Sequence, residues 1–305
     1  MVANGAVWLL AAAAVMSAWL YFRIWTLTRP PLGTVNLGDV SLTLACIVML
    51  PFLYIWLPGW LVGTLLAITT LSVLWFVVEP VTSAPLARWS VAGGLVAADL
   101  LLIRLDGSTS TLFLLVNDAV MLTIAVGVSN LWAQGGLRAR DMAILAGAIA
   151  LYDLVATGFL PITTAMIERL SGMPFLPMAV WPTGSGHWTG IGLGDLLMAA
   201  VGPLVMRKAF GRTAGLVAMA IALGAIAGVL VVARWDALPE TFPTMIVLGP
   251  IMVVHYILWS RRSGAERTYA RYLAEEPRAH PSLGGVGWGN GPRVLANRAH
   301  KRPAA

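Results

Sequence analysis

The chain has 305 residues, of which 58% are hydrophobic and only 11% are charged, whereas a soluble domain carries roughly 25% charged residues. A single soluble core is excluded, because it would leave too much apolar surface to be solvated. Long apolar runs recur from end to end, and runs of about 20 apolar residues satisfy their backbone in lipid as helices. The formal net charge of +6 equals the balance of charges after residue 260. Attraction to anionic lipid explains this charge, and no nucleic-acid partner is expected.

The hydropathy pattern predicts an all-α polytopic membrane protein with nine transmembrane helices. The second and third predicted helices are joined by only a few residues that include Pro58 and Gly59, so they form an antiparallel hairpin. The fourth is interrupted by Asp99. The predicted helices, in chain order, are 5–22, 37–57, 60–79, 86–103, 111–133, 141–162, 190–206, 213–233 and 242–259.

The predicted helices group into three parts of the chain. Residues 1–136 hold helices one to five, and residues 137–262 hold helices six to nine. The longest internal connection, 163–189, is rich in Pro, Gly and Met. Residues 263–305 have scattered Arg, many Gly and little apolar content, which predicts a disordered basic tail.

The distribution of basic residues predicts the orientation of the bundle. With the N-terminus outside, the inner side of the membrane has ten Lys and Arg close to the helices and the outer side has three. Because cytoplasmic loops carry an excess of basic residues, we expect an N-out, C-in topology. This places the tail in the cytoplasm and the protein in a bacterial-type cell membrane.

Four carboxylates and one histidine fall inside predicted helices, where an ionisable side chain is costly and is a functional candidate by default. They are Asp99, Asp118, Asp153, Asp195 and His255. Asp153 lies about 18 Å from the inner end of the sixth helix at 1.5 Å per residue, roughly 12 Å below the outer edge of a core about 30 Å thick. Asp195 lies about 8 Å below the same edge. The two carboxylates are therefore predicted to lie at similar depth on consecutive antiparallel helices.

Two adjacent carboxylates in a dry site share one proton, which provides an acid and a base at neutral pH. Such a pair can activate a water molecule against an amide, with one group taking the proton of the water and the other supporting the carbonyl oxygen. The three glycines before Asp195, which are Gly190, Gly192 and Gly194, leave room for a backbone or a substrate to approach closely and allow the start of the helix to flex.

The motifs around these aspartates are specific. Tyr152-Asp153 in one predicted helix and Gly192-Leu193-Gly194-Asp195 in the next resemble the presenilin and signal peptide peptidase family of intramembrane aspartyl proteases. The resemblance implies nine helices with the catalytic pair, Asp153 and Asp195, in helices six and seven. Tyr152, Gly192, Leu193 and Gly194 would support the pair. The predicted orientation is that of the signal peptide peptidase branch, which implies type II or signal-peptide-like transmembrane segments as substrates.

That family also has a Pro-Ala-Leu motif at the head of its last helix, from which this chain departs. The candidates here are Pro243-Thr244-Met245 and Ala237-Leu238-Pro239. We favour the segment from Pro243 to Met245 as a substrate-binding element, because about sixteen apolar residues follow it. The alternative role for Pro243 is simply that of a proline at a helix start.

The other intramembrane polar residues have no matching motif. Asp99 and Asp118 are expected to be structural, because polar side chains in membranes pair across helices. His255 is expected near the inner edge, far from the aspartates. The four histidines are scattered and no His-Glu-x-x-His is present, so we expect neither a metal nor another cofactor.

Two other functions fit the same carboxylates. A proton-coupled transporter would use them to carry protons, and a scaffold would use them to hold helices, although no inverted repeat is evident. The type IV prepilin peptidase family also has Gly-x-Gly-Asp, but it usually has Lys two residues after the Asp, where this chain has Leu197. The sequence favours the intramembrane protease.

Overall fold

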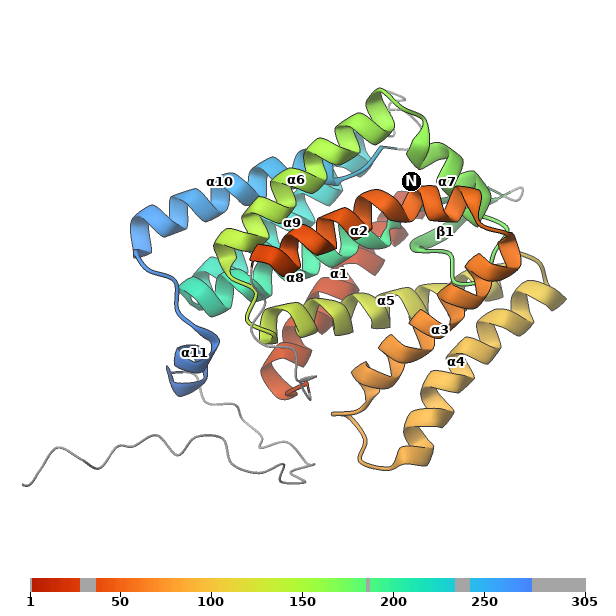
Figure 1. Ribbon diagram of the computed structural model, residues 1–305, viewed down its shortest axis with the longest axis horizontal. Coiled ribbons are helices and arrows are strands. Elements are labelled where there is room, and N and C mark those ends of the chain that lie inside the picture. The colour runs from red at the N-terminus through yellow and green to blue at the C-terminus, as the bar shows by residue number, and fades with distance from the viewer. Residues whose placement is uncertain (1, 28–36, 185–186, 234–241, 276–305) are drawn as a thin grey trace, which may run out of the picture.

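The computed structural model describes residues 2–27, 37–184, 187–233 and 242–275. In this part of the chain there are eleven helices and one antiparallel sheet of two strands (Figure 1). The helices are α1 Val2–Ile24, α2 Leu37–Trp56, α3 Gly59–Val78, α4 Pro85–Leu105, α5 Thr111–Gln134, α6 Ala139–Gly158, α7 Ile162–Leu170, α8 Leu193–Phe210, α9 Arg212–Ala233, α10 Met245–Ser263 and α11 Tyr269–Glu275. The strands are β1 Met178–Gly184 and β2 His187–Gly192.

Seven of these helices are long and apolar enough to cross a membrane: α1 to α6 and α9. The prediction of a helical integral membrane protein is therefore confirmed. Each of the nine predicted segments also coincides with a helix within a few residues. The helices at the seventh and ninth positions are α8, which has Asp195, Arg207 and Lys208, and α10, which ends with two arginines. They lie outside the group of seven, and the count of nine crossings stays a prediction.

The connection expected at 163–189 holds most of helix α7, strand β1 and the start of β2. Two expectations about local structure are wrong. Residues 187–192, whose last three we placed in the seventh helix, form strand β2, and α8 begins only at Leu193. The tail is ordered at its start, because α11 docks with buried Tyr269 and Tyr272; residues 276–305 lie outside the described residues.

Helices α5 and α8 form the centre of the bundle. Helix α5 contacts α1, α3, α4, α8 and strand β1, and both α5 and α8 have buried residues on all sides. The largest hydrophobic cluster runs from Val7 in α1 through Ala125 in α5 to Val201 in α8 and Leu248 in α10. The predicted N-terminal and catalytic parts of the chain thus share one core.

Helices α6 and α10 lie side by side over the centre of the bundle (Figure 1). They cross at Gly249, where an added Cβ would lie 2.6 Å from the carbonyl oxygen of Ala146 and 2.7 Å from Cβ of Ala150. Small residues allow this close approach between helices. The start of α6 is tied to the chain just after α10, because Glu266 accepts hydrogen bonds from the N–H groups of Ala139 and Arg140, both at 2.9 Å. The two helices are therefore antiparallel, and the C-terminal half of α6 lies beside the N-terminus of α10.

Candidate active site

Asp153 lies on α6, one helical turn beyond the crossing with α10. Ala150, which meets Gly249 at that crossing, precedes Asp153 by three residues and so lies on the same side of the helix. The Asp153 side chain is partly buried. The tight crossing thus places a carboxylate next to the N-terminus of α10.

Asp195 lies in the first turn of α8, behind Gly192, which has an extended conformation (φ −62°, ψ 145°) at the N-cap. Its carboxylate does not cap its own helix. Instead, Oδ1 accepts a hydrogen bond from the backbone N–H of Met245 at 3.0 Å, and Oδ2 accepts one from the N–H of Thr244 at 3.3 Å. These N–H groups belong to the start of α10, where a helix leaves its first donors unpaired and stabilises a nearby negative charge.

Asp153 and Asp195 are close enough for their charges to interact. Their surroundings differ, because Asp195 accepts two backbone hydrogen bonds whereas no hydrogen bond to Asp153 is found within the described residues. The hydroxyl of Tyr152 is buried and also lacks a partner there. The structure therefore brings together the two predicted aspartates and the segment Thr244–Met245, which comes from the proposed substrate-binding element.

The glycines of the motif differ in how tightly they are packed. A Cβ at Gly192 would lie 3.6 Å from Oδ2 of Asp195, which is an ordinary contact, and one at Gly194 would meet nothing within 4 Å. Gly190 is the restricted position, because a Cβ there would lie 2.6 Å from Cγ1 of Val180 and 2.7 Å from the carbonyl oxygen of Ala179. The sequence analysis noted Gly190 only as one of three glycines; its requirement comes from the hairpin.

The hairpin leads directly into the site, since β2 ends at Gly192. In an antiparallel pair, the backbone groups of alternate residues point toward and away from the partner strand. Val180 pairs with Gly190, and its N–H donates to Oδ1 of Asp118 at 2.7 Å, so it points away from β2. The outer edge of β1 is thus covered by α5. The backbone N–H and C=O groups of Gly190, opposite Val180, therefore point away from β1, to the outer edge of β2. No backbone hydrogen bond to them is found among the described residues.

Asp99 and Asp118 both hold the segment before α8, a role that the sequence did not indicate. Both were expected to pair with neighbouring helices, but each accepts a hydrogen bond from the backbone of the segment before α8: Asp99 from Phe175 and Asp118 from Val180, both at 2.7 Å. The neighbouring Asn117 contacts the same segment. The only sequence signal for this contact was the Asn-Asp pair itself in the middle of an apolar helix.

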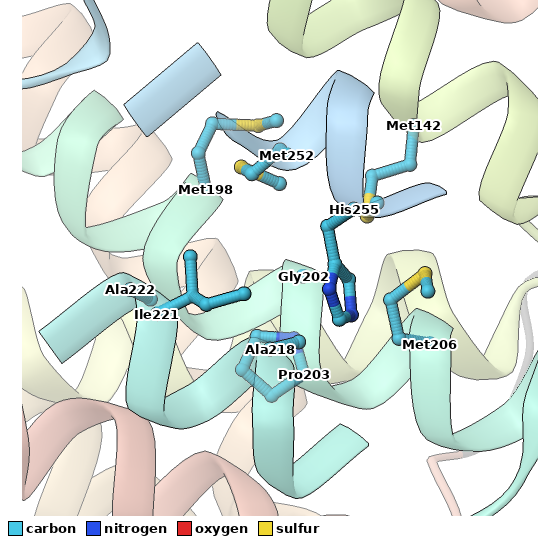
Figure 2. Close-up of a pocket in the computed structure, with 10 residues that line it drawn as sticks. All are labelled: Met142, Met198, Gly202, Pro203, Met206, Ala218, Ile221, Ala222, Met252 and His255. Atoms are coloured by element: carbon cyan, nitrogen blue, oxygen red, sulfur yellow. The ribbon is translucent and has the colours of Figure 1, made fainter. Parts of the chain in front are cut away.

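His255 lies ten residues beyond Met245 on α10, about 15 Å along the helix. It points into a pocket lined by Met142, Met206 and other apolar side chains of α6, α8, α9 and α10 (Figure 2), and its Nε2 lies 3.3 Å from the carbonyl oxygen of Ala214. The residues that line this pocket include no other titratable group. Across the described ranges, no group of three or more His, Cys, Asp or Glu could hold a metal ion.

No family model matches this sequence, and no curated protein is similar enough to count as a match.

Proposed function

We propose that the protein is an intramembrane aspartyl endopeptidase in which Asp153 and Asp195 form the catalytic pair. The observation that carries the proposal is that the start of α10 lies against both aspartates: its N–H groups hold Asp195, and its close crossing with α6 lies one helical turn from Asp153. The resemblance to the presenilin and signal peptide peptidase family adds support from the motifs alone.

The different surroundings of the two carboxylates suggest different roles. Asp195, held by two N–H groups, is the ionised base and Asp153 is the protonated acid. Asp195 takes a proton from a water molecule, whose oxygen bonds to the carbonyl carbon of the substrate while Asp153 gives its proton to the carbonyl oxygen. The resulting gem-diol collapses as the C–N bond breaks. The leaving nitrogen then takes the proton from Asp195, and the gem-diol returns one to Asp153.

The outer edge of β2 is the proposed site for the substrate. A helical amide is shielded by its own turn, so a transmembrane substrate must unwind before it is cleaved. An extended peptide can pair with an unpaired strand edge through its main chain, and the edge at Gly190 leads to Asp195 within five residues. Gly192 has no side chain, so a second backbone can approach the strand beside Asp195.

The substrates proposed are type II or signal-peptide-like transmembrane segments, cleaved without a metal or another cofactor. This class follows from the N-out, C-in orientation, which the basic residues support. It places the C-terminal tail in the cytoplasm and the protein in a bacterial-type cell membrane.

The alternative, a proton-coupled transporter or a scaffold, uses the same carboxylates without hydrolysis. An aspartyl-protease inhibitor that has a hydroxyl in place of the scissile amide distinguishes the two, since mimics of the transition state bind far more tightly than substrates. We expect such inhibitors to raise the unfolding temperature of the wild-type protein, and we expect the shift to disappear in Asp153→Asn. An inhibitor panel that gives no shift with the wild-type protein would favour the transporter or scaffold.

A further inference from the structure

The segment between α7 and α8 is held by buried side chains of α4 and α5. The carboxylate of Asp99, on α4, accepts a hydrogen bond from the N–H of Phe175 at 2.7 Å. On α5, Asn117 donates from Nδ2 to the carbonyl oxygens of Leu176 and Met178 at 3.1 and 3.0 Å. Asp99 and Asn117 are fully buried. Buried polar groups of this kind are costly unless they are paired, so these contacts fix the segment firmly.

The backbone at Phe175 shows how closely the segment is constrained. Phe175 is the single non-glycine residue with a positive φ, 58°, in the described part of the chain, and the left-handed region is uncommon for bulky side chains. Its side chain is fully buried in a cluster with Leu74 and Val120. Such a conformation persists where the surroundings hold it, and the hydrogen bond to Asp99 is one of the contacts that do so.

A short path of hydrogen bonds runs from Asn117 to Leu193, two residues before Asp195. The two carbonyl groups that Asn117 holds flank Pro177, and the carbonyl oxygen of Pro177 accepts a hydrogen bond from the N–H of Leu193 at 2.9 Å. Leu193 is the first residue of α8, and Asp195 follows two residues later. The position of residues 176–178 therefore sets where α8 begins.

Asp118 holds the same segment two residues further along, on strand β1. Its Oδ1 accepts a hydrogen bond from the N–H of Val180, which points away from β2. Because Val180 pairs with Gly190 on β2, this contact holds β1 in place along α5, and the strand pairing in turn holds β2. A slip of one residue in a strand would exchange the faces on which its side chains lie. The alignment of a substrate along β2 would change with it.

We propose that Asn117 and Asp118 are positioning residues of the active site: Asn117 sets the start of α8 and so the place of Asp195, and Asp118 sets the register of the strand edge that receives the substrate. The proposal rests on the proposed function for its catalytic meaning. Neither residue touches the reacting atoms. Both act through backbone groups that lead to Asp195 or to Gly190.

The test compares variants of the full-length protein in lipid vesicles with a transmembrane reporter peptide, whose products are weighed by mass spectrometry. Asn117→Leu and Asp118→Leu remove the contacts. Asn130→Leu is the matched control, because Asn130 lies on the same helix about 20 Å from Asn117, is also fully buried, and bonds to the carbonyl oxygen of Ala18 at 3.1 Å. Asp118→Asn is the conservative variant, since its amide oxygen can still accept from Val180.

We expect Asn117→Leu to lower kcat by roughly 10- to 100-fold, as a displacement of about 1 Å does to catalysis elsewhere, with little change in KM. Asp118→Leu is expected to change the ratio of products cut at neighbouring peptide bonds, and Asp118→Asn to keep the wild-type ratio. Asn130→Leu is expected to lose activity only in proportion to any loss of folded protein. If Asn117 and Asp118 have a purely structural role, all the leucine variants lose activity only in proportion to their loss of folded protein. That result would overturn the proposal.

Amide hydrogen exchange separates this proposal from the proposed function, because it measures the opening of individual N–H groups without any cleavage assay. We expect Asn117→Leu to speed exchange at Leu193 and Asp118→Leu to speed exchange at Val180, and Asn130→Leu to change neither. If these two variants exchange faster but the wild-type protein cleaves no substrate, the proposed protease function is overturned and the positioning contacts remain. Unchanged exchange together with an unchanged product ratio in an active protein would overturn the positioning role alone. Asn117→Asp, which has the same shape but no amide donor, should behave as Asn117→Leu.

Discussion

The backbone N–H of Met245 donates to Oδ1 of Asp195 at 3.0 Å, which joins the first turns of α8 and α10 although the two residues are 50 positions apart in the chain. The neighbouring N–H of Thr244 donates to the other carboxylate oxygen at 3.3 Å. The proposed substrate-binding element thus holds the candidate base through two backbone N–H groups, and the side chain of Thr244 interacts with the same carboxylate. The two backbone contacts do not depend on the side chains of a Pro-Ala-Leu motif.

The crossing of α6 and α10 gives the first prediction. Gly249→Ala places a methyl group 2.6 Å from the carbonyl oxygen of Ala146, so the helices must separate near Asp153. We expect a loss of about 1–3 kcal/mol in the free energy of unfolding and a larger loss of cleavage activity. Denaturant unfolding in detergent measures the first and a reporter assay the second.

Gly224 on α9 offers the matched control, since a Cβ there meets nothing within 4 Å. Gly224→Ala should be neutral or stabilise the helix by up to about 1 kcal/mol. Equal effects of the two alanine substitutions would show that the close approach at Gly249 is unimportant.

The glycines before Asp195 give the second prediction. Gly190→Ala collides with the backbone of β1, whereas Gly194→Ala meets nothing within 4 Å. We expect Gly190→Ala to lower the unfolding temperature and Gly194→Ala to leave it unchanged. If Gly194→Ala nevertheless loses cleavage activity, the position is needed for a substrate and not for the fold. An unfolding temperature lowered more by Gly194→Ala than by Gly190→Ala would contradict the packing described for the hairpin.

Helix α11 gives a prediction about pH. Hydrogen bonds from Arg267 at 2.8 Å and Arg271 at 2.6 Å hold the pKa of the Glu275 carboxyl below its ordinary value of 4.5. Since the pKa is lower in the folded form, the contribution of Glu275 to docking of α11 is fully present above pH 4.5 and is lost as the pH falls through the lowered value. The effect should be small, because exposed ion pairs contribute little.

A spin label at the exposed position Ala274 measures this docking. We expect the label to gain mobility as the pH falls below the ordinary pKa of Glu275, and to have the same mobility at all these pH values in Glu275→Gln. A mobility that changes equally with pH in both proteins would mean that another group controls the docking.

The helices and the two aspartates could be predicted from the sequence because their signals are local. Apolar runs of membrane-spanning length show the helices, and the residues next to Asp153 and Asp195 are the basis for the hypothesis that these two form a pair. The hairpin was missed because its strands are short: the apolar start of β1 lies within a segment rich in Pro and Gly, and Gly190 and Gly192 suggested a flexible helix start. Pairing between strands, which excludes a Cβ at Gly190, is what fixes their conformation.

The remaining contacts depend on partners that are distant in sequence. Asn117 and Asp118 bind backbone groups about 60 residues later, and no pattern in one sequence shows which backbone a buried side chain will reach. Helix α11 was missed because few apolar residues surround it. Its docking depends on Tyr269 and Tyr272, which lie three residues apart and contact Phe22 of α1.

Cleavage of a type II transmembrane reporter by the purified protein in lipid vesicles tests the central claim most directly. We expect the wild-type protein and Asp99→Asn to cleave it, the latter because an amide oxygen can still accept from Phe175. Asp153→Asn and Asp195→Asn, folded to the same extent, should lower the rate by roughly 10²- to 10⁴-fold. Product formed at the wild-type rate by either of these two variants would contradict the assignment of Asp153 and Asp195 as the catalytic pair.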